Sequence, residues 1–523
     1  RPCRWRRNSS KRDQRIMAQA PASSIAMPPP VAGWDTRESL ADMPETHAVI
    51  LDNWFPSTDK VTVRRGNTVH ATGMAGDVES LIEYIPLSGT GQLFAANGGK
   101  IYDVTSAGAV GTAVSSGHSN NQWQFVNMGT AAGQFVRCFN GEDTPLLFNG
   151  STWATTAITG TGLTATKLIW GNIHQNRLWV GEVDSLSAYY LAVNNVSGAA
   201  TEFPLAGVFR RGGYIAGMGT WTRDAGDGMD DVAVFVTSEG EVAVYSGTNP
   251  ASVNTWALIG VFSIGMPIGR RFFVKAGSDL VLITQDGFVP LSAILTMDRS
   301  QAELAALSQQ ISKAVNDAVR SYKDVFGWQA ILYPKGQMLV FNVPLSTTTM
   351  HQYVFNTITG APCRFTGMNA LCFGLIEDSL MWGSTDGVVY KFDNGTSDNG
   401  AAIEADGAQA FSYFKSPSQN KVFKLAEPVF ESDGNPNAAI DINTDFQIKV
   451  PTGIAQASPT RSGIWGVSLW GRGIWGTANQ IYRGWRGVRG VGRSAAIRIR
   501  IDTTTARPSW ISTNFTFVRG GQL

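Results

Sequence analysis

The chain has 523 residues and a mass of 56.3 kDa, which is too long for one small hydrophobic core. Its formal net charge of +1 argues against nucleic-acid binding over the whole surface, and no apolar run approaches the ~18 residues that a membrane-spanning helix needs. The 57 glycines, the 10% aromatic and 16% charged residues, and the short alternating runs of Val and Thr favour an all-β fold rich in turns.

Residues 1–32 are expected to form a disordered leader that is basic and then proline-rich. The first 16 residues lack the apolar core of a signal peptide, and we expect the true start at Met17. The run APASSIAMPPP, residues 20–30, should be extended and mobile because its proline, serine and alanine residues favour no packed structure.

The stretch LDNWFPSTDKVTVRRG, residues 51–66, joins an aromatic cluster to a short alternating strand and two arginines. It contains no catalytic group. The apolar side chains of Trp54, Phe55 and Pro56 are suited to docking against another part of the molecule. We assign residues 33–75 to a segment that lies outside the repeated domain described next.

Residues 76–400 repeat one sequence pattern. It consists of an alternating apolar strand, a turn with Gly and a polar residue, and a second strand. The clearest copies are GQLFAANGGKIYDV (91–104), RCFNGEDTPLLFNGSTW (137–153), NRLWVGEVDSLSAYYLAV (176–193), DVAVFVTSEGEVAVYSG (231–247), DLVLITQDGFVPLS (279–292), GQMLVFNVPLSTTTMHQYVFNTITG (336–360) and DSLMWGSTDGVVYKFD (378–393). Their spacing is near the ~40–50 residues of a propeller blade. The sequence therefore predicts a β-propeller of six or seven blades, and an array of β-sandwiches is the alternative.

One helical insertion interrupts this pattern at residues 297–328. Apolar side chains recur at steps of three and four, which predicts an amphipathic helix with a stripe to bury, formed by Leu304, Leu307, Ile311, Val315, Val319 and Tyr322. Asp298 or Ser300 can cap its start. We expect the helix to dock on the outside of the propeller, or on another subunit.

Residues 401–523 predict a separate C-terminal β domain, with alternating strands at 438–450, 494–503 and 509–518. Its charge is strongly asymmetric. The part from residue 451 to the end holds ten arginines and no lysine against one acidic residue, Asp502, a net charge of +9.

Strand alternation in SAAIRIRIDT puts Ile497, Ile499 and Ile501 on one face and two arginines on the other. The arginines are expected to face water, a neighbouring subunit or DNA, and two upstream arginines could extend the same basic face. This predicted face consists of Arg489, Arg493, Arg498 and Arg500. Sequence-independent contacts with DNA phosphates and ion pairs with carboxylates of a neighbouring subunit both remain open.

Tryptophans flanked by glycines are a second feature of the C-terminal part, where the triplet Ile-Trp-Gly occurs twice. Such side chains are large apolar anchors for a partner, or they belong to the core of the β domain. The candidates are Trp465, Trp470, Trp475 and Trp485.

No catalytic constellation is recognisable, and the sequence predicts neither an enzyme nor a bound cofactor. The five histidines are scattered without a metal-binding pair, and the four cysteines lack the spacing of a zinc site or of a disulfide framework, so we expect free buried thiols. One run, RDAGDGMDD, is a calcium candidate through Asp224, Asp227, Asp230 and Asp231, although a solvated turn is the favoured interpretation.

Three stretches together resemble a known family. They are GWDTRESLADMPETHAVILDNWFPSTDKVTVRRG (33–66), the uneven propeller with its helical insertion, and a tail containing GIWG, WRGVRGVGRSAAIRIRI and FTFVRGGQL. The chain is similar to the tail nozzle proteins of short-tailed bacteriophages, also called tail tubular protein B or packaged-DNA stabilisation proteins. The resemblance covers the chain from Gly33 onward, and its most specific part is Asn53 to Pro56 followed by Arg64, Arg65 and Gly66.

The resemblance implies a structural protein of the virion tail, assembled in the host bacterial cytoplasm as a homo-hexameric ring. Double-stranded DNA would pass along the axis of the ring, which retains the packaged genome and takes part in its ejection. The N- and C-terminal β segments would form a platform into which Trp54, Phe55 and Pro56 dock. A tail adaptor above, tail fibres or spikes nearby, and the host cell surface at the distal end are the implied partners.

Two alternatives come from other functional classes. One is a propeller hydrolase or lyase acting on host glycans, or a tail protein that binds a host receptor. The other is a monomeric propeller scaffold that binds peptides.

Overall fold

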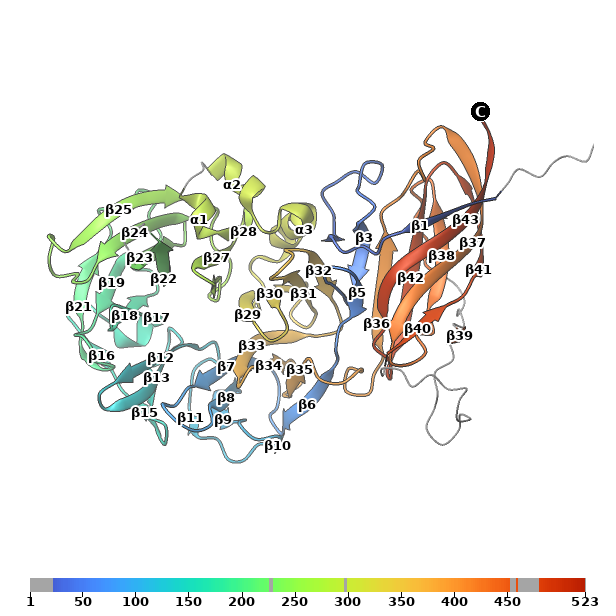
Figure 1. The fold of residues 1–523 in the computed structure, drawn as a ribbon. Coiled ribbons are helices and arrows are strands. Elements are labelled where there is room, and N and C mark those ends of the chain that lie inside the picture. The colour runs from blue at the N-terminus through green and yellow to red at the C-terminus, as the bar shows by residue number, and fades with distance from the viewer. Residues whose placement is uncertain (1–21, 225–228, 296–298, 452–457, 460–478, 523) are drawn as a thin grey trace, which may run out of the picture.

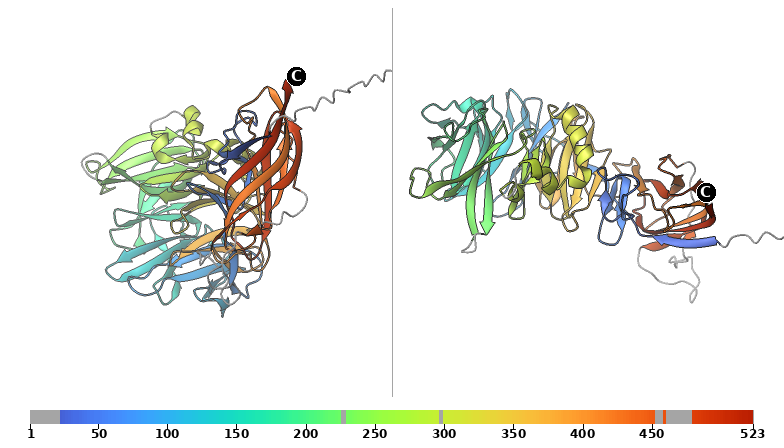
Figure 2. Two further views of the ribbon diagram at one scale, coloured as in Figure 1. Left: turned by 45° about the vertical axis from the view of Figure 1, so that its right-hand side comes forward. Right: turned by 90° about the horizontal axis from the view of Figure 1, so that it is seen from above.

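The computed structural model describes residues 22–224, 229–295, 299–451, 458–459 and 479–522. Figure 1 shows a ring of small sheets beside a two-layered β domain, which we call the platform. In the views of Figure 2 the platform lies to one side of the ring, with N-terminal strands between the two.

Antiparallel sheets follow one another around the ring. Four of them are simple four-stranded blades with the strands β7 (Val78–Tyr84), β8 (Gln92–Asn97), β9 (Lys100–Asp103) and β11 (Ser115–Ser116); β12 (Gln124–Thr130), β13 (Gly133–Phe139), β14 (Leu146–Phe148) and β15 (Trp153–Thr155); β17 (Leu168–His174), β18 (Arg177–Glu182), β19 (Ser187–Tyr190) and β21 (Thr201–Pro204); and β22 (Ile215–Asp224), β23 (Met229–Thr237), β24 (Glu241–Gly247) and β25 (Trp256–Ser263). The short strands β16 (Ile158–Thr159) and β20 (Gly198–Ala199) pair in parallel, and a 3-10 turn, η1 (Ala165–Lys167), precedes β17.

Two further four-stranded sets and one three-stranded sheet complete the ring. Their strands are β26 (Phe273–Ala276), β27 (Asp279–Thr284) and β28 (Gly287–Pro290); β29 (Gln329–Tyr333), β30 (Met338–Pro344), β31 (Met350–Asn356) and β32 (Pro362–Phe365); and β33 (Ala370–Ile376), β34 (Ser379–Ser384), β35 (Val389–Phe392) and β6 (Asn67–Thr72), with β10 (Gly108–Ala109) at the edge. In the described ranges, six blades of the ring thus have at least four strands each. The three-stranded sheet lies between β22–β25 and β29–β32.

This arrangement confirms the predicted all-β propeller. Each of the seven hairpins recognised in the sequence forms two neighbouring strands of one sheet, and in six of the sheets these are the two middle strands of the blade. Gly240, in the turn between β23 and β24, has a φ of +76°, and a Cβ there would lie 2.4 Å from the Ile264 carbonyl oxygen. A residue with a side chain would therefore disrupt that turn.

The propeller begins earlier than residue 76. Strand β6 pairs with β35 as an outer strand of the last blade, so a strand from before the first blade joins the ends of the ring. The expected boundary was wrong because the alternation of 67–72 does not reveal a partner more than 300 residues away.

The helical insertion is segmented, not continuous. It consists of α1 (Leu291–Ile294), α2 (Arg299–Ala305), the 3-10 turn η2 (Gln309–Ile311) and α3 (Ser312–Tyr322). The helix breaks where the Leu307 N–H donates to the Phe288 carbonyl and the Ser308 hydroxyl accepts from the Phe288 N–H. Ile311, Val315 and Val319 are buried as predicted, whereas Leu304 and Leu307 are exposed. The insertion packs on β27 and β28 of its own chain.

The platform has two sheets. The junction sheet continues from the blade β29–β32 into β3 (His47–Asp52), β36 (Ile403–Gln409), β42 (Ala495–Thr503) and β38 (Ala439–Thr444), with β2 (Gly33–Trp34) beside β3. The distal sheet contains β1 (Ala22–Met27), β4 (Trp54–Pro56), β5 (Val61–Val63), β37 (Gln419–Ser432), β39 (Ser458–Pro459), β40 (Gln480–Arg483), β41 (Arg486–Gly492) and β43 (Ser509–Gln522). The N- and C-terminal segments thus share both sheets.

Part of the expected leader is ordered, which corrects the sequence prediction for residues 1–32. Strand β1 pairs antiparallel with β43, from Ala22 opposite Val518 to Met27 opposite Thr513. Met27 is buried and Ile25 is partly buried against the core. The strand exists because a distant partner supplies its backbone hydrogen bonds, which local composition does not show.

Candidate functional site: the propeller–platform junction and the platform arginines

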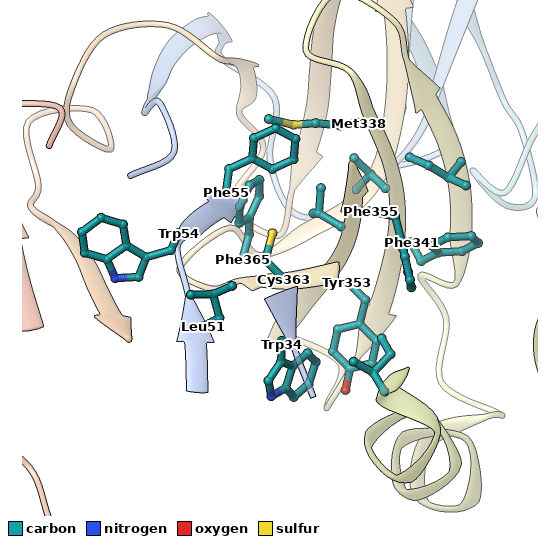
Figure 3. Close-up of a cluster of buried hydrophobic side chains, with 14 of the residues drawn as sticks. Trp34, Leu51, Trp54, Phe55, Met338, Phe341, Tyr353, Phe355, Cys363 and Phe365 are labelled. Atoms are coloured by element: carbon teal, nitrogen blue, oxygen red, sulfur yellow. The ribbon is translucent and has the colours of Figure 1, made fainter. Parts of the chain in front are cut away.

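The segment Asn53–Pro56 lies between the propeller and the platform, and Figure 3 shows its two aromatic rings pointing in opposite directions. Trp54 is fully buried and meets Trp510 of the platform in an edge-to-face contact, with ring centroids 6.2 Å apart. Phe55 instead contacts Phe365 of the blade at 6.5 Å. One continuous core therefore runs from the platform into the propeller.

This geometry refines the expected docking role. Trp54 packs into the platform as predicted, but Phe55 packs on the propeller, and the Pro56 carbonyl accepts a hydrogen bond of 2.8 Å from the Asn356 amide of the blade. Alternation along β4 sends neighbouring side chains to opposite faces, and the two faces of this strand belong to different domains.

Asn53 connects three segments at the point where the chain passes from the junction sheet to the distal sheet. Its backbone has a φ of +59°, a conformation that asparagine tolerates better than most residues. Its amide nitrogen donates to the Thr366 hydroxyl at 2.9 Å and to the Glu404 carbonyl at 2.8 Å. Its amide oxygen accepts from Arg64 Nε at 2.8 Å and from the Thr366 N–H at 2.9 Å. All four hydrogen-bonding positions of this buried amide are occupied.

Arg64 is buried at the same junction, with 1% of its surface exposed. Its Nη1 and Nη2 bind the two carboxylate oxygens of Asp398 at 2.9 and 2.6 Å. The remaining donors reach Asn53 and the carbonyls of Arg65 and Thr366. A planar guanidinium with five donors fits this set of acceptors, which a lysine ammonium would not.

The network extends into the last blade. Asn67 donates to Asp398 at 2.7 Å and accepts from the indole N–H of Trp382 at 2.9 Å. The neighbouring Gly66 leaves no room for a side chain, because a Cβ there would lie 1.9 Å from the Ser397 carbonyl oxygen. The loop 394–401 is thereby fixed against the start of the propeller.

Sequence reasoning missed Asp398 and Asn67. The stretch NGTSDNG gives only a loop signal, and its aspartate meets an arginine that lies 334 residues earlier. No local periodicity reports such a contact.

The junction sheet carries a row of ion pairs on the face opposite the isoleucines. Arg364 binds both oxygens of Asp52 at 2.7 Å, and Arg498 binds both oxygens of Asp406 at 2.9 and 2.5 Å. Asp52 and Asp406 are register partners on β3 and β36. The hydrogen bonds to Asp406 raise the pKa of Arg498.

These pairs correct the predicted basic face. Ile497, Ile499 and Ile501 fill the core as expected, but Arg498 is 9% exposed and neutralised within its own chain. Arg500 is half-buried and lies 3.1 Å from Glu404 and 3.4 Å from Asp502. The prediction failed because alternation gives the face of a side chain, while the carboxylates that face it lie on β36, which the sequence did not identify as a strand.

Arg489 and Arg493 differ from these two. Both are exposed, at β41 and just after it, and neither forms an ion pair with any residue in the described ranges. The same holds for Arg483 in β40 and Arg519 in β43. Figure 1 places β41 and β43 on the side of the platform away from the propeller, whereas β36 faces it. We call Arg483, Arg489, Arg493 and Arg519 the distal arginines.

The remaining sequence candidates are placed as follows. Trp485 lies between β40 and β41 with 44% of its surface exposed, and Trp465, Trp470 and Trp475 lie outside the described residues. Asp231 accepts a 2.7 Å hydrogen bond from Thr222, and Asp224 and Asp230 lie on the paired strands β22 and β23. Asp227 lies outside the described residues. Among the residues that are described, no group of three His, Cys, Asp or Glu side chains is arranged to hold a metal ion.

The connection that precedes β26 is hydrogen-bonded to the first two blades of the propeller. Arg271 Nη2 donates to the Glu79 and Trp123 carbonyls at 2.9 and 3.1 Å and to the Ser80 hydroxyl at 2.6 Å. Gln124, on β12, donates to the Arg270 carbonyl at 2.6 Å. Two cavities of about 340 and about 250 Å³ are both lined by Gln124, Arg270 and Arg271.

The described cysteines are buried free thiols. Cys138, Cys363 and Cys372 form no disulfide, and burial raises the pKa of each, that of Cys372 to about 12. No helix in the described part of the chain is both long and apolar enough to cross a membrane.

Known proteins resemble the chain only at low sequence identity. No protein-family model and no curated protein matches the chain. A crystal structure of BBS1N in complex with ARL6DN, soaked with mercury, aligns with a TM-score of 0.40 and 8% identity over 64% of this chain and 99% of that one. Raptor of Chaetomium thermophilum aligns with a TM-score of 0.36 and 12% identity over 66% and 29% of the two chains.

Proposed function

We propose that the protein is a structural subunit of the tail nozzle of a short-tailed bacteriophage. In this proposal, identical chains form a ring, double-stranded DNA passes along the ring axis, and the ring retains the packaged genome until ejection. The observation that carries the proposal is the sorting of arginines in the platform. Those facing the propeller are paired with carboxylates, and the distal arginines are exposed and unpaired within the described chain.

The charge of the surrounding sequence strengthens this reading. Between Pro451 and Ile501 the chain contains no acidic residue, so the 452–478 segment supplies no carboxylate for the distal arginines. Arginines left without anions suit phosphate contacts that are independent of sequence, because a genome passing through a ring must not be read base by base.

The contacts of Arg271 with the first two blades agree with a DNA path outside each propeller. The cavities that remain there are far too small for a duplex whose major groove alone is ~12 Å wide. The junction network supports the same arrangement, because a platform that lines a channel and a propeller that stands beside it must keep a fixed relative position. The proposed partners are a tail adaptor above the ring and fibres or spikes beside it.

Electron microscopy of the native assembly tests the proposal. We expect a closed ring of six chains, with the distal arginines toward the axis and the propellers outside, because a ring coaxial with DNA requires cyclic symmetry. Rings of three or twelve chains, or an assembly with the distal arginines on its outer surface, would contradict it. If the purified chain is a monomer in solution, the number of chains in the ring is counted in the native particle.

A further inference from the structure

A cavity of about 340 Å³ lies beside the connection that precedes β26. The residues that matter for its chemistry are Gln124, Arg270, Arg271, Lys323, Asp324 and Phe326. A second cavity shares Gln124, Arg270 and Arg271 and reaches the inner strands β17, β29 and β33. The two arginines therefore line both cavities.

The lining of the cavity is predominantly cationic, although the Glu79 carboxylate also acts on Arg271. Three cationic side chains line it, against the single carboxylate of Asp324. Arg270, Arg271 and Lys323 form no ion pair with any residue that the structure describes. Arg270 Nη1 reaches only the neutral carbonyl of Asn140, at 2.9 Å.

The Arg271 guanidinium is held in place by hydrogen bonds, and some of its N–H donors are unused. Its Nη2 is fixed by three neutral oxygens, and its guanidinium lies 5.8 Å from the centre of the Phe326 ring. The Nε and Nη1 donors have no hydrogen-bond partner in the described chain, and protein atoms do not enclose them. Burial lowers the pKa of Arg271, so an anion beside it would stabilise the charged form.

We propose that this central pocket binds a phosphate-type oxyanion, as the free ion or as the terminal phosphate of a small molecule. The unused Nη1 donors of Arg271 can reach an oxygen of the ion, and Arg270 and Lys323 supply further positive charge. The cavity volume admits such an ion and excludes a nucleic-acid strand.

Calorimetric titration of the full chain with inorganic phosphate, at constant ionic strength set by sodium chloride, tests this site. We expect saturable binding of one phosphate per chain. The double variant Arg270→Gln, Lys323→Gln should weaken binding at least about tenfold, because it removes two of the three positive charges that line the cavity. The control Lys313→Gln, Arg320→Gln removes one lysine and one arginine from exposed positions on α3 and should bind as the parent does.

Each variant is first checked for an unchanged Tm, and the two single variants serve if the double variant does not fold. Non-saturable heats, equal binding by the Arg270, Lys323 variant, or acetate binding as tightly as phosphate would overturn the assignment. Glycerol phosphate used as a second titrant distinguishes the two sources, since tighter binding than inorganic phosphate identifies a phosphorylated small molecule and weaker binding identifies the free ion.

Discussion

Arg64 and Asp398 show how single residues connect the two domains. The guanidinium has no hydrogen left unbound, and its carboxylate partner is also held by Asn67. Within a buried site, such a pair is costly to break even where it adds little net stability, because the surviving partner keeps an uncompensated charge.

Arg64→Ala is expected to destabilise the fold by about 3–5 kcal/mol, since it leaves Asp398 and Asn53 without their main donors. Arg64→Lys should also destabilise, because one ammonium cannot replace five directed donors. Urea unfolding measures both. The adjacent Arg65 is the control, because its side chain is half exposed and lies 3.7 Å from Asp393. Arg65→Ala should cost less than about 1 kcal/mol, and equal losses at the two positions would contradict the role of the junction network.

Because His174 is buried, we expect the protein to lose stability at acidic pH. Burial lowers the pKa of this histidine to about 4, and its ring lies against Thr220 and Trp256. Because the folded-state pKa is below the unfolded value of about 6.5, the folded protein resists protonation. Stability is therefore greatest above pH 6.5 and falls as the pH drops toward 4. His174→Gln should lose less stability than the parent between these pH values, as measured by Tm at each pH, and parallel losses would exclude His174 as a cause.

Strand β42 carries buried isoleucines and a paired arginine. Strand β41, which precedes it in the chain, carries an exposed arginine. Isoleucines enter the core, Arg498 meets Asp406 across the sheet, and Arg489 on β41 meets no described partner. Reversing the charge therefore has different consequences on two consecutive strands that belong to different sheets of the platform.

Arg498→Glu is expected to destabilise the platform by about 3–5 kcal/mol or to prevent folding, because it sets a carboxylate against Asp406 in a nearly buried site. Arg489→Glu should change the free energy of unfolding by less than about 0.5 kcal/mol. Thermal unfolding followed by circular dichroism compares the two variants. A stable Arg498→Glu protein would mean that the ion pair is not needed for the fold.

In the whole molecule, the platform and the propeller share one core and one buried polar network, so they should move as one body. The ring proposed above would then present the distal arginines at fixed positions. We therefore expect the assembled ring to bind DNA through electrostatic contacts whose strength depends on the salt concentration.

Arg489→Glu, Arg493→Glu should fold normally but bind duplex DNA less tightly when assembled. If each arginine contacts one phosphate, the slope of log K against log salt should fall by about two. Fluorescence anisotropy at several salt concentrations measures the slope. Lys313→Glu, Arg320→Glu on α3 is the matched control. An unchanged slope in the Arg489→Glu, Arg493→Glu variant would contradict the proposal that these arginines face DNA.

The sequence by itself determined the features that repeat locally. Alternation and turn residues identified all seven hairpins of the propeller and the inward face of Ile497, Ile499 and Ile501, because strand period and tight turns depend on a few adjacent residues. The helix stripe was predicted correctly only from Ile311 onward.

Only the tertiary structure decided which distant segments pair. The position of β6 in the last blade, the order of β1, the carboxylate opposite Arg498 and the partner of Arg64 all depend on contacts between residues that are far apart in the sequence, from 92 positions upward. Side-chain period gives the face of a strand but not its neighbour, so two arginines with the same alternation can be neutralised or left exposed. The charge that a platform offers to a partner is set by those neighbours.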